Sequence, residues 1–537
     1  MKKCAIQTFI LGGIVGALLF VCLYGFNVLN IMNTQWIYVQ KGHDIMQHQL
    51  GFEFFLNDVW HFPFGNYNNM IYPVGTSVVY TDSIPLMAIL FKVFRSFLPD
   101  SFQYFGIWGG LCFTLQGALS AIILQKYINS KLVIFSVLPI FVYSSTLVHR
   151  MFGHTALGGQ WIILLSIAAF IYSHNYKSIK IKILVWAGIT SLSVMVHAYF
   201  LPMVGIVMFF YLIGESIENH TCRNAFIIFM AAVASTIVVF FLIGGFSTSG
   251  SFAESGVGEY SMNVNALFNS GGRSRIFRAL PYATNGQYEG FQFLGAGMMV
   301  ILLSCLFKAI ANPRRLKDGW GLQNSLLLGI ILSLFVLAAS PKVSFMNKVV
   351  IDYSSCLWFV RLMSPFRSTG RLFWPAFYLI QFGMVSFLYN NTHNKKALIC
   401  FLLCCSFVHV WDMSDFLIEK GAKVKTDSIY INNFEKELSN ELIRNKHIYY
   451  LSSDGSQYED LAIAAFRYGL TLNDGNVARK DAALIQKKNT EVIEGLLKGI
   501  IRDDTIYVIA DEYTFVPEQI DVGIVKKIDN FVVIYCQ

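Results

Sequence analysis

Residues 104–125 read YFGIWGGLCFTLQGALSAIILQ, an apolar stretch that contains no Asp, Glu, Lys or Arg. A helix of about 20 such residues is long enough to cross the hydrocarbon core of a bilayer. Comparable blocks recur along the chain and predict eleven crossings, at 5–31, 104–125, 131–149, 155–173, 181–198, 201–216, 224–245, 291–311, 324–340, 372–389 and 396–412. The sequence therefore predicts a mainly α-helical, polytopic transmembrane bundle.

The composition of the whole chain excludes several other classes of protein. Of its 537 residues, 55% are hydrophobic and only 14% are charged, whereas about a quarter of the residues in a soluble domain are charged. The same apolar content excludes a disordered chain. A disulfide scaffold is also excluded, because there are only 10 Cys, without CxxC or Cys/His metal spacing.

The first apolar block, 5–31, has features of both a signal peptide and a membrane anchor. Its apolar stretch is long and no convincing cleavage site follows it, so we interpret it as an anchor. Lys and Arg accumulate in short cytoplasmic loops. This bias is met if the N-terminus is cytoplasmic and the apolar segment 83–97 does not cross the membrane. The long segments then all lie outside, at 32–103, 246–290, 341–371 and from about 413.

Two domains are predicted from these patterns. Residues 1–412 form the transmembrane domain, with a large first outer loop at 32–103. The tail, 413–537, combines a polar helical stretch at 457–470 with strand-like runs at 448–451, 505–509, 522–525 and 530–536. This mixture predicts a small C-terminal α/β domain on the extracytoplasmic side.

The first outer loop contains several polar residues that are unusual in a membrane protein and therefore candidates for a function. Asp44 and His48 are four residues apart and share one face if 44–56 is helical. That spacing can orient a catalytic carboxylate or bind a cation. Asp44 can equally cap the helix N-terminus, where acidic residues are favoured. Asp82, just before 83–97, has the same two interpretations.

A second group of polar residues flanks the outer ends of later spans. Arg150 and His154 border the turn between the third and fourth spans, where basic residues indicate either an anionic partner or snorkelling to lipid headgroups. His197 and Tyr199 lie in the tight turn between spans five and six, where a histidine is either structural or a ligand. Glu289 lies where 246–290 re-enters the membrane, and an ionisable group at that depth is a functional candidate.

Arg367 and Arg371 form the last group, in the run SPFRSTGR before the tenth span. Two arginines at this spacing can bind a phosphate with forked hydrogen bonds, or contact anionic lipid heads. No P-loop, dinucleotide fingerprint, GxSxG or HExxH motif occurs. The predicted topology sends every group to one side, which predicts an outer-leaflet cavity where a carboxylate deprotonates a hydroxyl and cations stabilise a departing phosphate.

In layout, the chain resembles the GT-C superfamily of polytopic glycosyltransferases, which use polyprenyl-phosphate-linked sugars on the non-cytoplasmic face. The runs that look like an uncharacterised bacterial branch of it are 42–48, 60–65, 82–86, 149–154, 197–202, 287–291, 366–374 and 475–479. The resemblance implies juxtamembrane helices in the first outer loop, at 44–59 and 83–97, and an essential acidic residue early in it, for which Asp44 is the best counterpart. A clean DxD or ExD pair is absent from the sequence, which leaves open whether a divalent cation takes part.

The resemblance also implies a function. The protein would move a sugar from a polyprenyl-phosphate donor to a cell-envelope acceptor at the outer face of a bacterial inner membrane. Asp44 would be the catalytic base or orient it, and Glu289 and Asp82 would assist or position the acceptor. The lipid phosphate would be held by three arginines, Arg150, Arg367 and Arg371. Sugar or phosphate would also contact His48, His154, His197 and Tyr199.

Two other functions compete with this one. A lipid-linked glycan flippase or transporter would carry internal repeats and ionisable residues near the middle of the membrane, and the sequence has neither. A noncatalytic envelope assembly protein would use its tail to bind partners. The position of the polar residues at one end of the spans favours the transferase.

Overall fold

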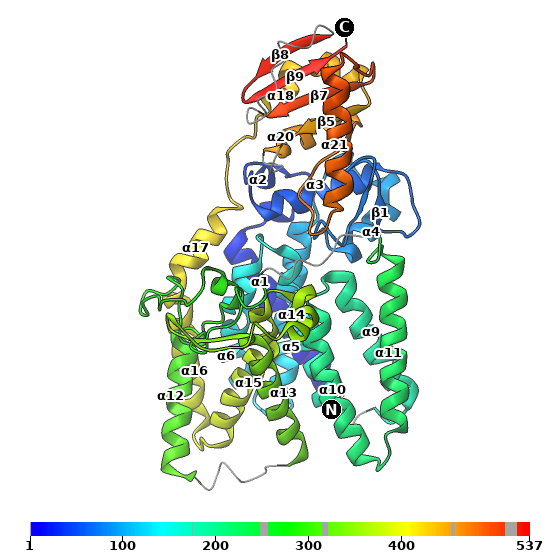
Figure 1. The fold of residues 1–537 in the computed structure, drawn as a ribbon. Helices are drawn as coiled ribbons and strands as arrows, with labels where there is room; N and C mark the ends of the chain where they lie inside the picture. Colours follow the sequence, from blue (N-terminus) through cyan, green and yellow to red (C-terminus); the bar gives the residue numbers. More distant parts are fainter. Residues whose placement is uncertain are drawn as a thin grey trace. The chain divides into compact units, whose positions relative to one another are not determined.

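The computed structural model describes residues 2–173, 176–247, 256–313, 321–452, 457–510 and 523–536, and it is mainly helical, as predicted (Figure 1). Eight helices in these ranges are long and apolar enough to cross a membrane, which supports a multi-pass membrane protein. They are α1 (Lys2–Tyr24), α5 (Phe105–Gln125), α6 with α7 (Lys131–Val142 and Ser145–Arg150), α9 (Ile179–Val196), α10 (Phe200–Glu218), α11 (Arg223–Leu242), α13 (Leu322–Ala339) and η8 with α15 (Thr369–Phe373 and Trp374–Asn390).

The other three predicted crossings are helical, but none is a single long span. The helices α16 (Lys395–Asp412) and α17 (Ser414–Ala422) pass the same test only as a pair, with a bend of 55° between them. Two shorter apolar helices follow the predicted ranges 155–173 and 291–311, namely η3 with α8 (Thr155–Gly158 and Trp161–Ile171) and α12 (Ala296–Ala311). Helix length therefore supports eight or nine spans among the described residues, and the total of eleven stays a prediction.

The chain divides into two compact units, which we describe separately. The helical unit comprises Met1–Asn30, Phe105–Ile237 and Phe252–Lys425. The loop–tail unit comprises Ile31–Tyr104, Val238–Ser251 and Thr426–Gln537. This division differs from the predicted domains, because the first outer loop packs with the tail and the residues from 413 to 425 continue the helical unit.

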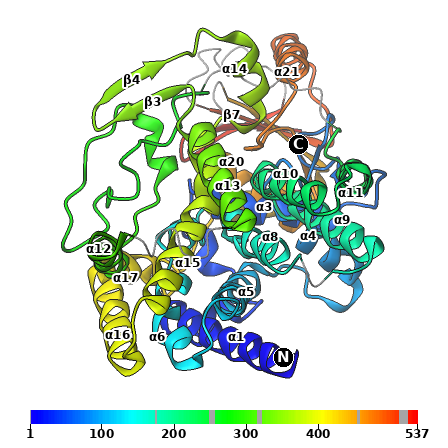
Figure 2. The same cartoon turned by 90° about the horizontal axis from the view of Figure 1, so that it is seen from below.

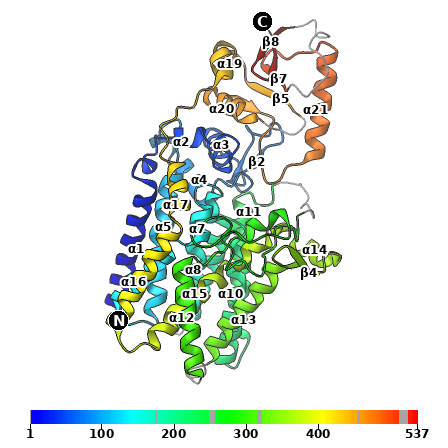
Figure 3. The ribbon, with the colours of Figure 1, turned by 90° about the vertical axis from the view of Figure 1, so that its left-hand side faces the viewer.

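Close packing of α1 against α5 organises the helical unit, and Figure 3 shows these helices side by side. A Cβ atom at Gly16 would lie 2.1 Å from the carbonyl oxygen of Phe113, and one at Gly117 would lie 2.3 Å from that of Gly12. Small residues four apart permit such an approach of two backbones within a membrane. The run GGIVG at 12–16 therefore fixes this helix pair.

The connections of the helical unit contain short elements. A hairpin of β3 and β4 follows α13, and one-turn helices flank the loops. The bounds are η1 (Asn27–Leu29), η5 (Asn285–Gly290), β3 (Lys342–Phe345), β4 (Lys348–Asp352), α14 (Leu357–Met363) and η7 (Ser364–Phe366).

The tail forms a five-stranded sheet with the order β6-β5-β7-β9-β8. The pairs β5–β6 and β5–β7 are parallel, and β7–β9 and β8–β9 are antiparallel. The predicted strands are present, except that residue 522 lies outside the described residues. The bounds are β5 (His447–Leu451), β6 (Thr471–Leu472), β7 (Thr505–Ala510), β8 (Ile524–Ile528) and β9 (Phe531–Tyr535).

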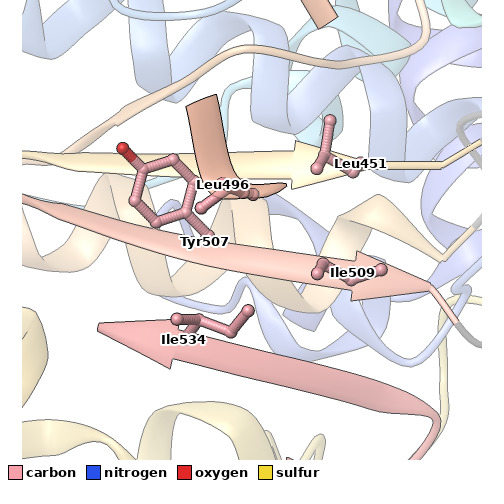
Figure 4. Packing of buried hydrophobic residues seen from close by; sticks show 5 residues of the cluster. All are labelled: Leu451, Leu496, Tyr507, Ile509 and Ile534. Atoms are coloured by element: carbon pink, nitrogen blue, oxygen red, sulfur yellow. The ribbon is translucent and has the colours of Figure 1, made fainter. Parts of the chain in front are cut away.

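Helices complete the tail on this sheet. The predicted helix at 457–470 is α20 (Tyr458–Tyr468), and α21 (Ala482–Leu497) is an additional long helix. One cluster of the core joins α21 to three strands through Leu451, Leu496, Tyr507, Ile509 and Ile534 (Figure 4). Two short helices precede the sheet, α18 (Asn433–Glu437) and α19 (Ser439–Arg444). The sheet and its helices thus form an α/β body, as predicted.

The first outer loop folds onto this body. It contains α2 (Gln35–Tyr38), α3 (Asp44–Asn57), β1 (Asn66–Tyr67), β2 (Thr76–Ser77), α4 (Pro85–Val93) and η2 (Arg95–Phe97). Main-chain hydrogen bonds connect loop and tail: Leu472 N–H donates to the Asn69 carbonyl (2.9 Å) and Ala478 N–H to the Tyr80 carbonyl (2.7 Å). The loop and the tail are therefore one folded unit, although a long stretch of sequence separates them.

The segment 83–97 forms only the nine residues of α4 and the short η2, too short to cross a membrane. Lys92, which interrupts its apolar pattern, is buried and donates from Nζ to the carbonyls of Phe55 (2.7 Å) and Val59 (3.2 Å) at the end of α3. The opposite face carries exposed apolar side chains, Leu90, Val93, Phe94 and Phe97. This arrangement is typical of a helix that lies at a membrane surface.

Candidate functional site

Three of the predicted residues, far apart in the sequence, meet in the helical unit. Glu289 Oε2 accepts hydrogen bonds from Arg150 Nη2 (2.5 Å) and from Arg371 Nε (2.8 Å). Arg150 Nη2 also donates to the main-chain carbonyl of Glu289 (3.2 Å). The three residues are 4%, 4% and 7% exposed. We call this set, Arg150, Glu289 and Arg371, the arginine–glutamate cluster.

A network of polar side chains fixes the position of Arg150, the last residue of α7. Pro139 lies near the end of α6, and the chain breaks before it continues as α7. Beside this break, Gln160 Oε1 accepts hydrogen bonds from Tyr378 Oη (2.5 Å) and Thr146 Oγ1 (2.9 Å). Ser145 Oγ donates to the Phe293 carbonyl (2.6 Å), which joins α7 to the segment that follows Glu289. The guanidinium is therefore held against η5 by buried hydrogen bonds.

Two glycines allow the remaining partners to approach. A Cβ atom on Gly370 would lie 2.8 Å from the Cα atom of Gly290, so only glycine fits where η5 and η8 meet. Gln292 Nε2 donates to the Gly370 carbonyl (2.7 Å), and Thr369 Oγ1 donates to the Ser340 carbonyl (3.0 Å). In the sequence, Glu289 is followed by Gly290, and Arg371 is preceded by Gly370. Each charged residue thus adjoins the glycine that permits the contact.

Tyr199 joins the cluster through Arg371. The Arg371 guanidinium lies over the Tyr199 ring, 4.8 Å from its centroid, and Tyr199 Oη accepts a hydrogen bond from Ser368 N (3.0 Å). A cation over an aromatic face is stabilised by the ring quadrupole. His197 Nδ1 accepts a hydrogen bond from Tyr199 N (3.1 Å). This contact agrees with the structural interpretation of His197, and its role as a ligand stays a prediction.

Arg367 and His154 belong to the same unit but have other surroundings. Arg367 is exposed, and its guanidinium lies 5.6 Å from the ring centroid of Tyr260. The sequence predicts that Arg367 and Arg371 bind one phosphate together. In the structure, Arg371 is buried and forms an ion pair with Glu289. His154 is half-buried immediately before η3. Its contact with a substrate stays a prediction.

The charges of the cluster hold Glu289 ionised. Burial alone raises the pKa of Glu289, but the positive charges of Arg371 and Arg150, and the hydrogen bonds they donate, outweigh burial and hold the pKa well below its usual range. Two guanidiniums and one carboxylate leave a net charge of +1 in a buried place. Arg150 Nε has no hydrogen-bond partner among the described residues. The cluster can therefore attract an anion, whereas Glu289 is a weak base.

Two further basic side chains, which the sequence does not predict, lie near Arg150. Lys420, on α17, donates from Nζ to the carbonyls of His149 (2.7 Å) and Met151 (3.2 Å). The Arg273 guanidinium lies 4.4 Å from the Phe291 ring centroid, and burial lowers its pKa. Neither residue lies in a recognisable motif. Arg273 adds positive charge to the surroundings of Arg150, and Lys420 connects α17 to the end of α7.

Asp44 and Asp82 belong to the loop–tail unit, and neither is the N-cap residue of a helix. Asp44 is the first residue of α3, whose N-cap is His43. Asp82 has a left-handed backbone with φ of 53°, and Ile84 is the N-cap of α4. Ile84, and not Asp82, is therefore the N-cap residue of α4. Asp44 lies in the first turn of α3, where an acidic residue interacts favourably with the end of the helix.

His48 lies within α3, which confirms the predicted helix at 44–56. It is buried, and its Nε2 lies 4.0 Å from Asp82 Oδ2. Binding of a divalent cation stays a prediction, as does the convergence of these residues with the arginine–glutamate cluster on one cavity.

Glu53, further along α3, is a buried acid for which no role is predicted from the sequence. Its Oε1 accepts hydrogen bonds from Tyr38 Oη (2.5 Å), Gln49 Nε2 (2.8 Å) and Ser101 Oγ (3.0 Å). Burial raises the pKa of Glu53 to about 7, although these hydrogen bonds and the charge of Arg467 lower it. The Glu53 carboxyl group therefore titrates near neutral pH.

Comparisons with known proteins identify a family but no activity. A family model described as a domain of unknown function (DUF6311) matches residues 13–414. A second model, described as the DUF6311 C-terminal domain, matches residues 440–536. No curated protein matches the chain.

Proposed function

The chain belongs to the DUF6311 family, whose function is unknown, and we propose that it is a membrane glycosyltransferase of the GT-C type. It transfers a sugar from a polyprenyl-phosphate donor to a cell-envelope acceptor. The reaction takes place on the extracytoplasmic face of a bacterial inner membrane, with the N-terminus in the cytoplasm. The bias of Lys and Arg toward the short loops supports this orientation.

The observation that carries the proposal is the net positive charge of the arginine–glutamate cluster. Arg150 ends one apolar helix, and Arg371 lies at the start of another, so the charge is held at the end of membrane-length helices. A guanidinium in a poorly hydrated place binds phosphate oxygens with short, charge-assisted hydrogen bonds. We propose that the phosphate of a lipid at the membrane surface binds at this position.

Each charged residue then has one role in transfer. The acceptor hydroxyl oxygen attacks the sugar carbon, and its proton passes to a carboxylate, for which we propose Asp44. The bond between that carbon and the phosphate oxygen breaks, and the phosphate leaves with the bonding electron pair. Arg150 and Arg371 stabilise the charge that develops on it.

The hydrogen bonds of Glu289 favour a positioning role within this scheme. A carboxylate that accepts from two guanidiniums is a poor proton acceptor, because protonation would break both ion pairs. We therefore propose that Glu289 orients Arg150 and Arg371 toward the phosphate. Asp82 and His48 remain candidates for positioning the acceptor, with Tyr199 and His154 near the sugar or phosphate. Arg367, which is exposed, would contact the donor before the donor phosphate binds to Arg150 and Arg371.

The experiment that tests the proposal starts with the wild-type protein purified with its native lipids. Mass spectrometry should detect co-purified polyprenyl-phosphate species, and a labelled polyprenyl-phosphate sugar should lose its sugar to an envelope extract. Asp44→Asn should abolish transfer while the protein still purifies with the lipid. The matched control is Asp100→Asn, a fully exposed acid of the same loop, which should transfer at the wild-type rate. Wild-type transfer by Asp44→Asn would remove Asp44 from the mechanism, and absence of both lipid and transfer in the wild type would favour an assembly protein.

A further inference from the structure

An apolar groove lies in the helical unit, and no residue of the arginine–glutamate cluster lines it. Its volume is about 910 Å³, and residues of α1, α5, α8 and α9 line it, among them Phe9, Leu119, Leu165 and Leu192. The helix α1 contributes its N-terminal turns and α5 its C-terminal turns. Figure 2 shows these four helices neighbouring one another, seen from this end.

The groove is a hollow that the protein itself does not fill. A Cβ atom on Gly188, which lines it, would meet no atom within 4 Å. The volume falls within the range of roughly 300–1,000 Å³ that is typical of small-molecule sites. The lining helices α1, α5 and α9 are all candidate membrane spans. At this depth the surrounding medium is lipid, so the occupant is an apolar chain.

Positive charge surrounds one end of the groove. Tyr172 and Tyr176 line this end, and Lys126 Nζ lies 5.3 Å from the Tyr172 ring centroid. Tyr172 Oη donates to the Ile122 carbonyl (2.9 Å), which fixes the ring beneath the lysine. Two more exposed lysines, Lys177 and Lys180, closely follow Tyr176 in the sequence.

The nearby acidic charge does not cancel these lysines. Glu215 accepts from Lys182 Nζ at 2.6 Å and 2.7 Å, so that acid is matched by another lysine. The end of the groove therefore keeps an excess of positive charge beside an apolar channel. Basic pockets between membrane helices bind the headgroups of anionic lipids.

We propose that this groove is a binding site for one anionic phospholipid. An acyl chain lies between α1, α5, α8 and α9, and the headgroup phosphate lies beside Lys126, Lys177 and Lys180. The site is distinct from the arginine–glutamate cluster, because none of the three residues of that cluster lines the groove. The proposal does not depend on the chemistry at the arginine–glutamate cluster.

Native mass spectrometry of the full-length protein tests the proposal, with nanodiscs of equal phosphatidylglycerol and phosphatidylcholine as the probe. The wild type should retain phosphatidylglycerol in preference to phosphatidylcholine. Gly188→Trp should lose the retained lipid, because the indole fills the groove. The matched control is Gly205→Trp, since Gly205 also has open space around it but does not line the groove. Should Gly188→Trp not fold, Ser191→Phe fills the same groove from another position.

The lysines provide a second readout that does not depend on filling the groove. Lys126→Gln combined with Lys180→Gln should keep a lipid but lower the preference for phosphatidylglycerol, by about fivefold for each lysine. Lys348→Gln, an exposed lysine of β4, is the control. Equal retention of both lipids by the wild type, or unchanged retention in Gly188→Trp, would overturn the proposal. A wild-type dimer that Gly188→Trp dissociates would also overturn it and assign the groove to a second copy of the chain.

Discussion

Arg371 and Glu289 form a buried ion pair, with 2.8 Å between Arg371 Nε and Glu289 Oε2. The same carboxylate oxygen accepts from Arg150. One acid thus neutralises part of the charge of two arginines that come from different helices. A buried charge that loses its partner is costly, because the protein interior does not solvate it.

Glu289→Gln should destabilise the protein by about 3–5 kcal/mol, since it leaves two buried guanidiniums close together without a counter-charge. Chemical unfolding of the detergent-solubilised protein measures this difference. Glu419→Gln is the control, because Glu419 forms an exposed pair with Lys423, and such pairs contribute about 0–1 kcal/mol. Equal unfolding midpoints for the two variants would contradict a structural role for the pair.

Arg371→Lys should reduce sugar transfer strongly, if the proposed function holds. An ammonium cannot donate to Glu289 and a phosphate with the planar fork of a guanidinium. The loss should lie mainly in kcat, because the arginines stabilise charge that develops during transfer. Arg367→Lys, at an exposed residue, should change KM for the donor more than kcat. If Arg371→Lys changed mainly KM and Arg367→Lys changed mainly kcat, the proposed roles of the two arginines would have to be exchanged.

The sequence predicts the helices and strands well because local patterns determine them. The uncharged run at 104–125 becomes α5, and the apolar, strand-like runs at 448–451 and 505–509 become β5 and β7. Lys92 shows where such patterns fail: it interrupts an apolar segment in the sequence, yet it is buried against the end of α3. The carbonyl groups that accept hydrogen bonds from Lys92 lie more than thirty residues away in the sequence. The periodicity of one helix cannot predict contacts between residues so far apart.

The candidate site shows the same limit for long-range contacts. The sequence identifies Arg150, Glu289 and Arg371 as unusual, because charged residues at the ends of apolar spans need a reason. It gives no sign that the three residues neutralise one another, since this depends on the meeting of η5 and η8. The sequence does not indicate a role for Lys420 or Arg273 either, because that role also depends on long-range contacts. Their importance comes only from the position of α17 and the loop beside Arg150.

The stability of the loop–tail unit should depend on pH through Glu53. The pKa of Glu53 is about 7 in the folded protein and about 4.5 when unfolded, so the folded state binds the extra proton between these values. Stability should therefore fall as pH rises from about 4.5 to 7, by on the order of 3 kcal/mol, and stay at the lower level above that. Glu53→Gln should remove this part of the pH dependence. Unfolding at several pH values measures it, and a wild type with the same pH profile as Glu53→Gln would contradict it.

Gly370→Ala should weaken the arginine–glutamate cluster without touching a charged residue. Its Cβ atom would lie 2.8 Å from the Cα atom of Gly290, so η5 and η8 must separate and lengthen the contact of Arg371 with Glu289. Overpacking of this kind costs about 1–3 kcal/mol. The control is Gly383→Ala in α15, where an added Cβ meets no atom within 4 Å and alanine favours the helix. Gly370→Ala should therefore lower the unfolding midpoint and, if the proposed function holds, the transfer rate, while Gly383→Ala should lower neither. A Gly370→Ala variant as stable as Gly383→Ala would mean that the two backbones separate without cost, and the glycines would then not explain how the cluster is held.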